Sequence, residues 1–310
     1  MQTNRAPIDW VIFVILTFLW ASAYAFTRLA VSQSNPELGF PPQFIIPVRL
    51  GLGALILLAV AIISRQKWPA LGDWKSWGLM AIMGVIGTAA PFFVITTAQQ
   101  TVASSLAALY VAAAPLFIAA IAHFIFHDDK LTSRKAVGIA VGFAGVAVLF
   151  GPEAIKSFGS ASVTAQALCL LGTLFYATAT ITARIARNIP PFIFAAGFVS
   201  FGAVISLPLL AFVDYSTLNP SGSAIAGLIG LAIGPTAMAS ILYLMLVART
   251  SATFLSMTGY TIPIVSAIIG YFAFSETQSW NAALAFAMIL SGVWLAQRGN
   301  TKQVIIINSP

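Results

Sequence analysis

Charged side chains are scarce in this 310-residue sequence. Asp, Glu, Lys and Arg together make up 7% of it, whereas 59% of the residues are hydrophobic. A soluble domain normally carries about 25% charged residues. The shortage of charge excludes a soluble globular protein, and we predict an all-α membrane protein.

Residues that bind metals or carry acid-base chemistry are also few. The chain has one cysteine, Cys169, and two histidines. One cysteine excludes a disulfide within the chain. An integral-membrane enzyme would need His, Cys, Asp or Glu side chains clustered in a site. We therefore expect no enzyme activity, no metal site and no cofactor.

Long hydrophobic runs are abundant. Crossing about 30 Å of hydrocarbon takes roughly 20 helical residues, and ten runs approach this length: 10–31, 43–64, 77–99, 102–126, 134–151, 163–185, 191–213, 223–247, 251–274 and 279–297. The alternative for the first run is a signal peptide, because Ala21-Ser22-Ala23 has the pattern of a cleavage site. Only Arg5 precedes it as a basic residue, and a similar segment recurs later, so we predict ten transmembrane helices.

The basic residues indicate the topology. With the N-terminus placed inside, twelve of the 15 Lys and Arg residues fall on the cytoplasmic side, and Arg28, Arg49 and Lys156 fall on the outer half. Cytoplasmic loops of membrane proteins carry such an excess. We predict a multi-pass protein of the cell inner (plasma) membrane with both termini in the cytoplasm. The net charge of +7 is thereby explained without a nucleic-acid partner.

The two halves of the chain share a pattern. Residues 91–115 (PFFVITTAQQTVASSLAALYVAAAP) and 235–263 each form two apolar helices joined by a polar turn, with a proline expected to interrupt each helix near its middle. Arg28 also matches Arg184, and Asp128 matches Glu276. We predict five-helix repeats over residues 1–152 and 153–300, followed by a cytoplasmic tail, 301–310. Because five is odd, the second repeat should be inverted relative to the first, with the Gln99-Gln100 and Arg249-Thr250 turns on opposite faces of the membrane.

Several short motifs resemble the EamA family of the drug/metabolite transporter superfamily. They are LWASAYAFTRLA (Leu19 to Ala30), PVRLGLGALILL (Pro47 to Leu58), the AAP and TIP prolines, the acidic turns at Asp128 and Glu276, and the Gly-Val pairs at Gly145 and Gly292. The chain departs from the usual Gly-Glu of the acidic turns. The resemblance implies transport, with export as the direction, and leaves the cargo open. We expect a secondary transporter that exports small organic metabolites such as amino acids by alternating access. The alternatives are a multidrug or toxic-compound exporter and a passive channel for small solutes.

A carrier of this kind needs a polar or aromatic pocket near the middle of the membrane. Arg49, inside a predicted span, is expected either to receive a substrate carboxylate or to extend to the outer interface. Arg28 lies farther from the centre and is expected to extend to the interface. Aromatic residues in the spans are either pocket lining or core; the candidates are Trp20, Tyr24, Phe92, Phe93, Tyr110, Tyr176, Tyr243 and Tyr260. The prolines at the helix breaks are candidate gating residues: Pro91, Pro115, Pro235 and Pro263.

The sequence contains few residues that could couple transport to protons. All eight acidic residues map to loops or helix ends, so a proton relay through a buried carboxylate is not expected. His123 is either a coupling residue that carries a proton or a hydrogen-bonded interfacial histidine. We expect transport down the substrate gradient or weak coupling to protons. The GxxxG pairs Gly138/Gly142 and Gly230/Gly234 either pack helices within one chain or support a dimer; we expect a monomer surrounded by the lipid bilayer.

Overall fold

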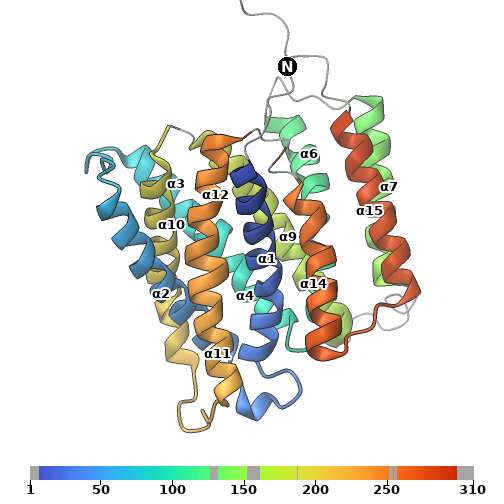
Figure 1. Cartoon of the computed structure of the whole chain (residues 1–310), viewed down its shortest axis with the longest axis horizontal. Helices are drawn as coiled ribbons and strands as arrows, with labels where there is room; N and C mark the ends of the chain where they lie inside the picture. The colour runs from blue at the N-terminus through green and yellow to red at the C-terminus, as the bar shows by residue number, and fades with distance from the viewer. Residues whose placement is uncertain are drawn as a thin grey trace, which may run out of the picture.

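The computed structural model describes residues 7–125, 132–151, 161–186, 188–250, 254 and 257–298. These residues form helices without a β-strand (Figure 1). The first half contains α1 (Pro7–Ala30), η1 (Pro36–Leu38), α2 (Pro42–Ile63), α3 (Trp74–Gly84), η2 (Val85–Ala89), α4 (Ala90–Ala98), α5 (Ser104–Val111), α6 (Ala114–Ile125) and α7 (Ser133–Phe150). The second half contains α9 (Ala161–Ile185), α10 (Pro191–Ser206), η3 (Leu207–Phe212), α11 (Gly222–Leu231), η4 (Ala232–Met238), α12 (Ala239–Arg249), α14 (Thr258–Phe274) and α15 (Trp280–Arg298).

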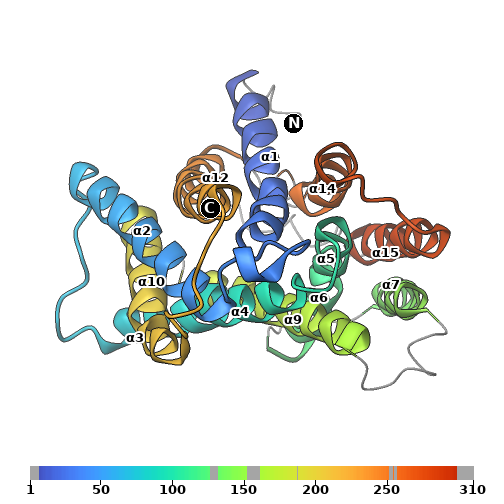
Figure 2. The same ribbon diagram turned by 90° about the horizontal axis from the view of Figure 1, so that it is seen from below.

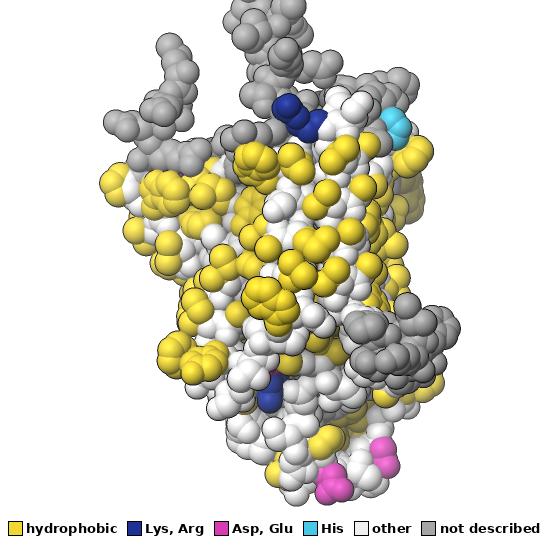
Figure 3. Space-filling model, turned by 90° about the vertical axis from the view of Figure 1, so that its right-hand side faces the viewer, with side chains coloured by type: hydrophobic (Ala, Val, Ile, Leu, Met, Phe, Trp, Pro, Cys, Tyr) yellow, Lys and Arg dark blue, Asp and Glu magenta, His cyan; other side chains and the backbone are white. Residues whose placement is uncertain are grey.

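The lengths of these helices fit a membrane. Within the described residues, eight helical stretches are long and apolar enough to cross it, and α14 and α15 contribute two shorter apolar helices. On the face shown in Figure 3, hydrophobic side chains cover the middle and the visible charged side chains lie toward its two ends. An apolar band of this kind is expected where lipid replaces water as the solvent. The prediction of an all-α, multi-pass membrane protein is confirmed; part of the predicted span 251–274 lies outside the described residues.

The helices pack in an elongated cross-section. Seen from below in Figure 2, α2, α3 and α10 gather at one side and α7 and α15 at the other, with α1, α4, α9, α12 and α14 between them. The main packing pairs are α7 with α15, α2 with α10, α4 with α9, and α1 with both α11 and α14.

The helix directions follow from contacts between loops. Phe40, just before α2, donates its backbone N–H to Ala30 at the end of α1, so α2 starts where α1 ends. Gln66, just after α2, accepts a hydrogen bond from the N–H of Phe192 at the start of α10, the helix that follows α9. Because α9 ends at the opposite side of the bundle from the end of α1, these two helices run in opposite directions.

The prolines near the helix middles have unequal effects. A π-helix, η2, precedes Pro91, and a second π-helix, η4, contains Pro235. Two turn residues separate α5 from α6 just before Pro115. By contrast, α14 runs unbroken through Pro263, because a proline removes only one backbone donor and the neighbouring hydrogen bonds of a helix can persist. The predicted interruption is therefore observed at three of the four prolines and is wrong for Pro263.

The GxxxG glycines serve packing within the chain. A Cβ added at Gly138 would lie 2.6 Å from the backbone of Gly292 and Ala296 on α15, and one added at Gly230 would lie 2.8 Å from the Phe26 ring on α1. Small residues allow helix backbones to approach this closely. Both glycine pairs are thus used inside the bundle.

Candidate functional site

Arg49 lies inside the bundle. It sits on α2, and only 5% of the residue is exposed, so it does not extend to the outer interface. Its Nε donates to Thr236 Oγ1 at 2.8 Å, and Thr236 Oγ1 in turn donates to the carbonyl of Leu231 at 2.9 Å. Thr236 belongs to the π-helix η4, a type of irregularity that is frequent at functional sites. The irregular turn next to Pro235 therefore places a hydroxyl against the guanidinium.

An aromatic ring covers the same guanidinium. Arg49 Cζ lies 3.7 Å from the centroid of Phe92 on α4, in cation–π geometry. Phe92 makes an edge contact with Tyr176 on α9, with the ring centroids 6.5 Å apart. Tyr24 on α1 and Tyr176 are close enough to interact electrostatically with Arg49. Five residues from five elements, Arg49, Phe92, Tyr176, Tyr24 and Thr236, thus form one cluster, which we call the Arg49 site.

The Arg49 site contains a charge without an acidic partner. Within the part of the chain that the structure describes, no carboxylate lies within 4.0 Å of Arg49, and Nε makes its one hydrogen bond. A charged side chain inside a membrane protein is costly and normally pairs with an opposite charge. The donors on the two Nη atoms remain able to bind an anionic group from outside the protein, with the fork geometry that suits a carboxylate.

A second aromatic pair lies along α1. Trp20 is one helical turn before Tyr24, and its ring lies 5.4 Å from that of Tyr243 on α12. Trp20 is partly buried and Tyr243 is 36% exposed. Phe93, next to Phe92, packs with Phe92 against the same hydrophobic cluster around α2 and α10. Trp20 and Phe93 thus share α1 and α4 with residues of the Arg49 site, and Tyr243 contacts Trp20.

Tyr110 and Tyr260 pack in different clusters. Tyr110 is fully buried, donates its hydroxyl hydrogen to Gln166 Oε1 and makes an edge contact with Phe150, with centroids 5.3 Å apart. Tyr260 packs in a cluster with residues of α7 and α15. Because the Tyr110 hydroxyl already has a partner, its geometry is that of a core residue.

The Tyr110 hydroxyl is expected to contribute to stability and not to substrate binding. Replacing Tyr110 by Phe removes one buried hydrogen bond, which typically contributes about 1 kcal/mol to the free energy of unfolding. We expect a lower unfolding temperature in detergent and an unchanged KM for transport. Tyr176→Phe, in the Arg49 site, is the matched variant and should raise KM. A higher KM for Tyr110→Phe with unchanged stability would contradict this assignment.

The candidate gating and coupling residues are dispersed. Pro91 and Pro235 directly precede Phe92 and Thr236, so the two π-helical breaks deliver the side chains that contact Arg49. Pro115 begins α6. His123 lies in the last turn of α6, against Phe124 and the α7 residues Ala136, Ile139 and Ala140. The elements around His123 contribute nothing to the Arg49 site.

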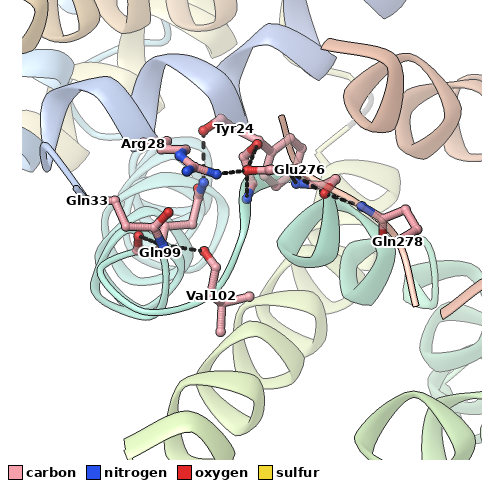
Figure 4. A network of polar contacts seen from close by, with 9 residues as sticks. Tyr24, Arg28, Gln33, Gln99, Val102, Glu276 and Gln278 are labelled. Atoms are coloured by element: carbon pink, nitrogen blue, oxygen red, sulfur yellow. Dashed lines mark hydrogen bonds and ion pairs between the residues drawn. The ribbon is translucent and has the colours of Figure 1, made fainter. Parts of the chain in front are cut away.

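A buried polar network lies where α1 ends (Figure 4). Glu276, in the loop between α14 and α15, forms an ion pair with Arg28 of α1. Arg28 also lies over the Phe274 ring, 4.6 Å from its centroid. Gln33 Nε2 donates to the carbonyls of Gln99 and Val102, both at 3.0 Å. Arg28, which is predicted to extend to the interface, thus has an acidic partner that is distant in sequence.

The two predicted turns lie at opposite ends of α1. Gln99 donates through Nε2 to the carbonyl of Tyr24, in the half of α1 that contains its C-terminus. Arg249 pairs through Nε with Asp9 Oδ1, at 2.7 Å, in the first turn of α1. Asp128 and the tail 301–310 lie outside the described residues.

Two functional candidates were not predicted from the sequence. Thr236 resembles any small hydroxyl residue, and its position next to a mid-helix proline is the signal that points to it. Glu276 was predicted to lie in a loop, and its burial depends on α1 and α5. Neither contact can be inferred from neighbouring residues.

The chain is similar to known proteins over most of its length. The sequence profile of the EamA-like transporter family matches residues 9–151 and again residues 163–297. The inner membrane transporter YedA of Escherichia coli K12, described as uncharacterized, is 26% identical over 92% of this chain and 89% of its own. The uncharacterized transporter YdfC of Bacillus subtilis is 24% identical over 89% and 86%. One crystal structure, 21% identical, superposes with a TM-score of 0.63 over 95% of this chain and 99% of the other, which shows a shared fold.

These similarities cover both halves of the chain and nearly its whole length. The relatives are transporters and not enzymes. The chain therefore belongs to the EamA-like transporter family.

Proposed function

We propose that this protein is a secondary carrier that exports a small carboxylate-bearing metabolite, such as an amino acid, by alternating access. The observation that carries the proposal is Arg49, which is buried inside the bundle without an acidic partner among the described residues. A substrate carboxylate would accept hydrogen bonds from its Nη atoms and supply the missing negative charge. The export direction rests on the resemblance to the family.

The residues around Arg49 support a substrate with an apolar part. Phe92 lies over the guanidinium and contacts Tyr176, and Trp20 and Tyr243 form a second pair along α1 and α12. Aromatic rings offer apolar contact surface, while the tyrosine hydroxyls can still form hydrogen bonds. We infer that the carboxylate binds at Arg49 and that the remainder of the substrate extends toward Trp20. An organic cation would be repelled by Arg49, which disfavours the multidrug alternative.

Alternating access is supported by the arrangement of the two halves. The family profile matches twice, and α1 and α9, the first helices of the predicted repeats, run in opposite directions. The first helix of each half packs on helices of the other half: α1 packs on α11 and α14, and α9 packs on α4 and α6. We propose ten transmembrane helices in two inverted repeats, 1–152 and 153–300, with Pro91 and Pro235 at the level of the site. Exchange of the two halves would then open the site to alternate sides.

The topology proposed from the basic residues puts both termini in the cytoplasm of the inner membrane. YedA is named as an inner membrane transporter, which agrees with this location. Both GxxxG pairs are used within the chain, which supports a monomer. His123 stays a candidate for weak proton coupling.

Counterflow in proteoliposomes tests the function. Vesicles loaded with one unlabelled compound are assayed for uptake of the same radiolabelled compound, over a panel of amino acids, their methyl esters and drug-like cations. We expect exchange of at least one amino acid and none of its methyl ester, because the ester lacks the negative charge. Exchange of the ester at the same rate would contradict binding at Arg49. Equilibration without counterflow would instead indicate a channel.

A further inference from the structure

The Glu276 carboxylate joins three parts of the bundle. Its Oε1 accepts hydrogen bonds from the Ser104 N–H at 2.9 Å and the Ser104 hydroxyl at 2.8 Å, and its Oε2 accepts from the Ser105 N–H at 3.0 Å and the Ser105 hydroxyl. Oε1 also pairs with Arg28 of α1. One side chain of the α14–α15 loop thus caps the N-terminus of α5 and holds α1 against it.

The surroundings of this carboxylate are closed. Glu276 is 8% exposed, and Ser104 and Ser105 are almost fully buried. The backbone N–H of Glu276 donates to the Gly270 carbonyl at the end of α14, and Gln278 Nε2 donates to Ser105 Oγ at 2.6 Å. Among the described residues, Arg28 is the one charged group in contact with the carboxylate; α5 presents two serines, and α14 presents its backbone.

We propose that Glu276 is a latch that holds the bundle closed at the end where α1 ends, and that protonation of its carboxylate releases this closure. The latch ties α1, which carries Trp20 and Tyr24, to α5, which packs against α1. Protonated Glu276 keeps two oxygens but loses the ion pair with Arg28 and part of the strength of its four hydrogen bonds. α1 and α5 can then separate, which opens a path toward the Arg49 site.

The sign of the pH effect follows from the contacts. Burial alone would raise the pKa of Glu276, but the hydrogen bonds from Ser105 and Ser104 outweigh it and leave the pKa below its ordinary value. The closed state therefore binds the proton more weakly than the open state, in which the carboxyl is solvated. The latch is fully formed above the ordinary Glu pKa of about 4.3 and is lost as the pH falls through the lower pKa of the closed state.

Cysteine accessibility in detergent tests the latch without any substrate. In a Cys169→Ala background, Val102→Cys reports on the closed end, because Val102 is 4% exposed beside the network. Asn219→Cys, on an exposed loop, is the matched control. The thiol reagent is 4,4′-dithiodipyridine, which remains reactive in acid. We expect Glu276→Gln to increase the Val102→Cys reaction rate at neutral pH by about tenfold or more, since hydrogen bonds to charged groups are strong, and to leave Asn219→Cys unchanged.

A double serine variant and an acidification series also test the latch. Ser104→Ala/Ser105→Ala retains the ion pair but removes two hydroxyl donors, so a smaller increase is expected even if Glu276→Gln does not fold. On acidification, the ratio of the Val102→Cys rate to the Asn219→Cys rate should rise in the protein with Glu276 and stay constant in Glu276→Gln. Unchanged rates in folded latch variants, or an equal acid response in Glu276→Gln, would overturn the proposal. Because no substrate is used, this outcome is independent of the counterflow result.

Discussion

Arg49→Met should lose counterflow of the carboxylate substrate and still fold. The variant removes two Nη donor groups, and hydrogen bonds to charged groups contribute about 1.5–3 kcal/mol each. Losing a bidentate pair would therefore weaken substrate binding by about 100-fold, at 1.4 kcal/mol per factor of ten. Arg49→Lys retains the charge but not the planar fork, so we expect an intermediate loss of about tenfold. The measurement is the KM of counterflow in proteoliposomes.

Stability separates a binding role from a structural role. Arg49 is a buried charge, and the groups that contact its guanidinium, the Thr236 hydroxyl and the Phe92 ring, are neutral. Its removal eliminates a desolvated charge and leaves the Thr236 hydroxyl bonded to the Leu231 carbonyl. The unfolding temperature of Arg49→Met should therefore equal or exceed that of the parent. Lys67→Gln, which removes an exposed cation beyond the end of α2, is the control and should change neither quantity. An unchanged KM in Arg49→Met would rule out Arg49 as the carboxylate site.

Gly292→Ala should destabilise the protein, although alanine normally favours a helix. A Cβ at position 292 of α15 would lie 2.5 Å from both the Gly138 carbonyl oxygen and the Gly142 nitrogen on α7. Backbone atoms cannot rotate away as a side chain can, so the two helices must separate. Overpacking of this kind costs about 1–3 kcal/mol or more. We expect the midpoint of thermal unfolding in detergent to fall by about 2–5 °C.

Gly51→Ala provides the matched control. Gly51 lies in α2, and a Cβ added there meets no atom within 4 Å. The same substitution should stabilise the protein by about 0.5–1 kcal/mol, because glycine loses more backbone entropy than alanine in a helix. Equal melting temperatures for the two variants would show that α7 and α15 do not pack backbone to backbone.

Much of the architecture can be predicted from local sequence. The cost of burying polar backbone in lipid leaves helices as the way for hydrophobic runs to cross. The hydrophobic runs therefore predict the membrane-crossing helices, of which the described residues contain eight that are long and apolar enough. The π-helical breaks near Pro91 and Pro235 also follow from local chemistry, since proline lacks the N–H that a regular helix needs. The choice of Arg49 as a candidate site residue also follows from its position inside a predicted span.

The partners of these residues depend on the fold. The sequence leaves open whether Arg49 points inward or toward the interface. Packing of α2 against η4 decides this by bringing the Thr236 hydroxyl to 2.8 Å from Nε. In the same way, hydropathy describes Arg28 and Glu276 as isolated charges 248 positions apart, and only the meeting of α1 with the α14–α15 loop makes them a pair.

One physical cause separates what the sequence predicts from what only the tertiary structure decides. Hydropathy, helix breaking and the distribution of basic residues are properties of short segments interacting with lipid and water, so they fix the class of protein, its helices and its candidate residues. Whether an aromatic residue is a core or a site residue depends on which helix lies opposite. Tyr110 and Tyr176 are similar in sequence context, yet one donates its hydroxyl hydrogen to Gln166 and the other lies beside Arg49. Contacts between distant helices alone distinguish them.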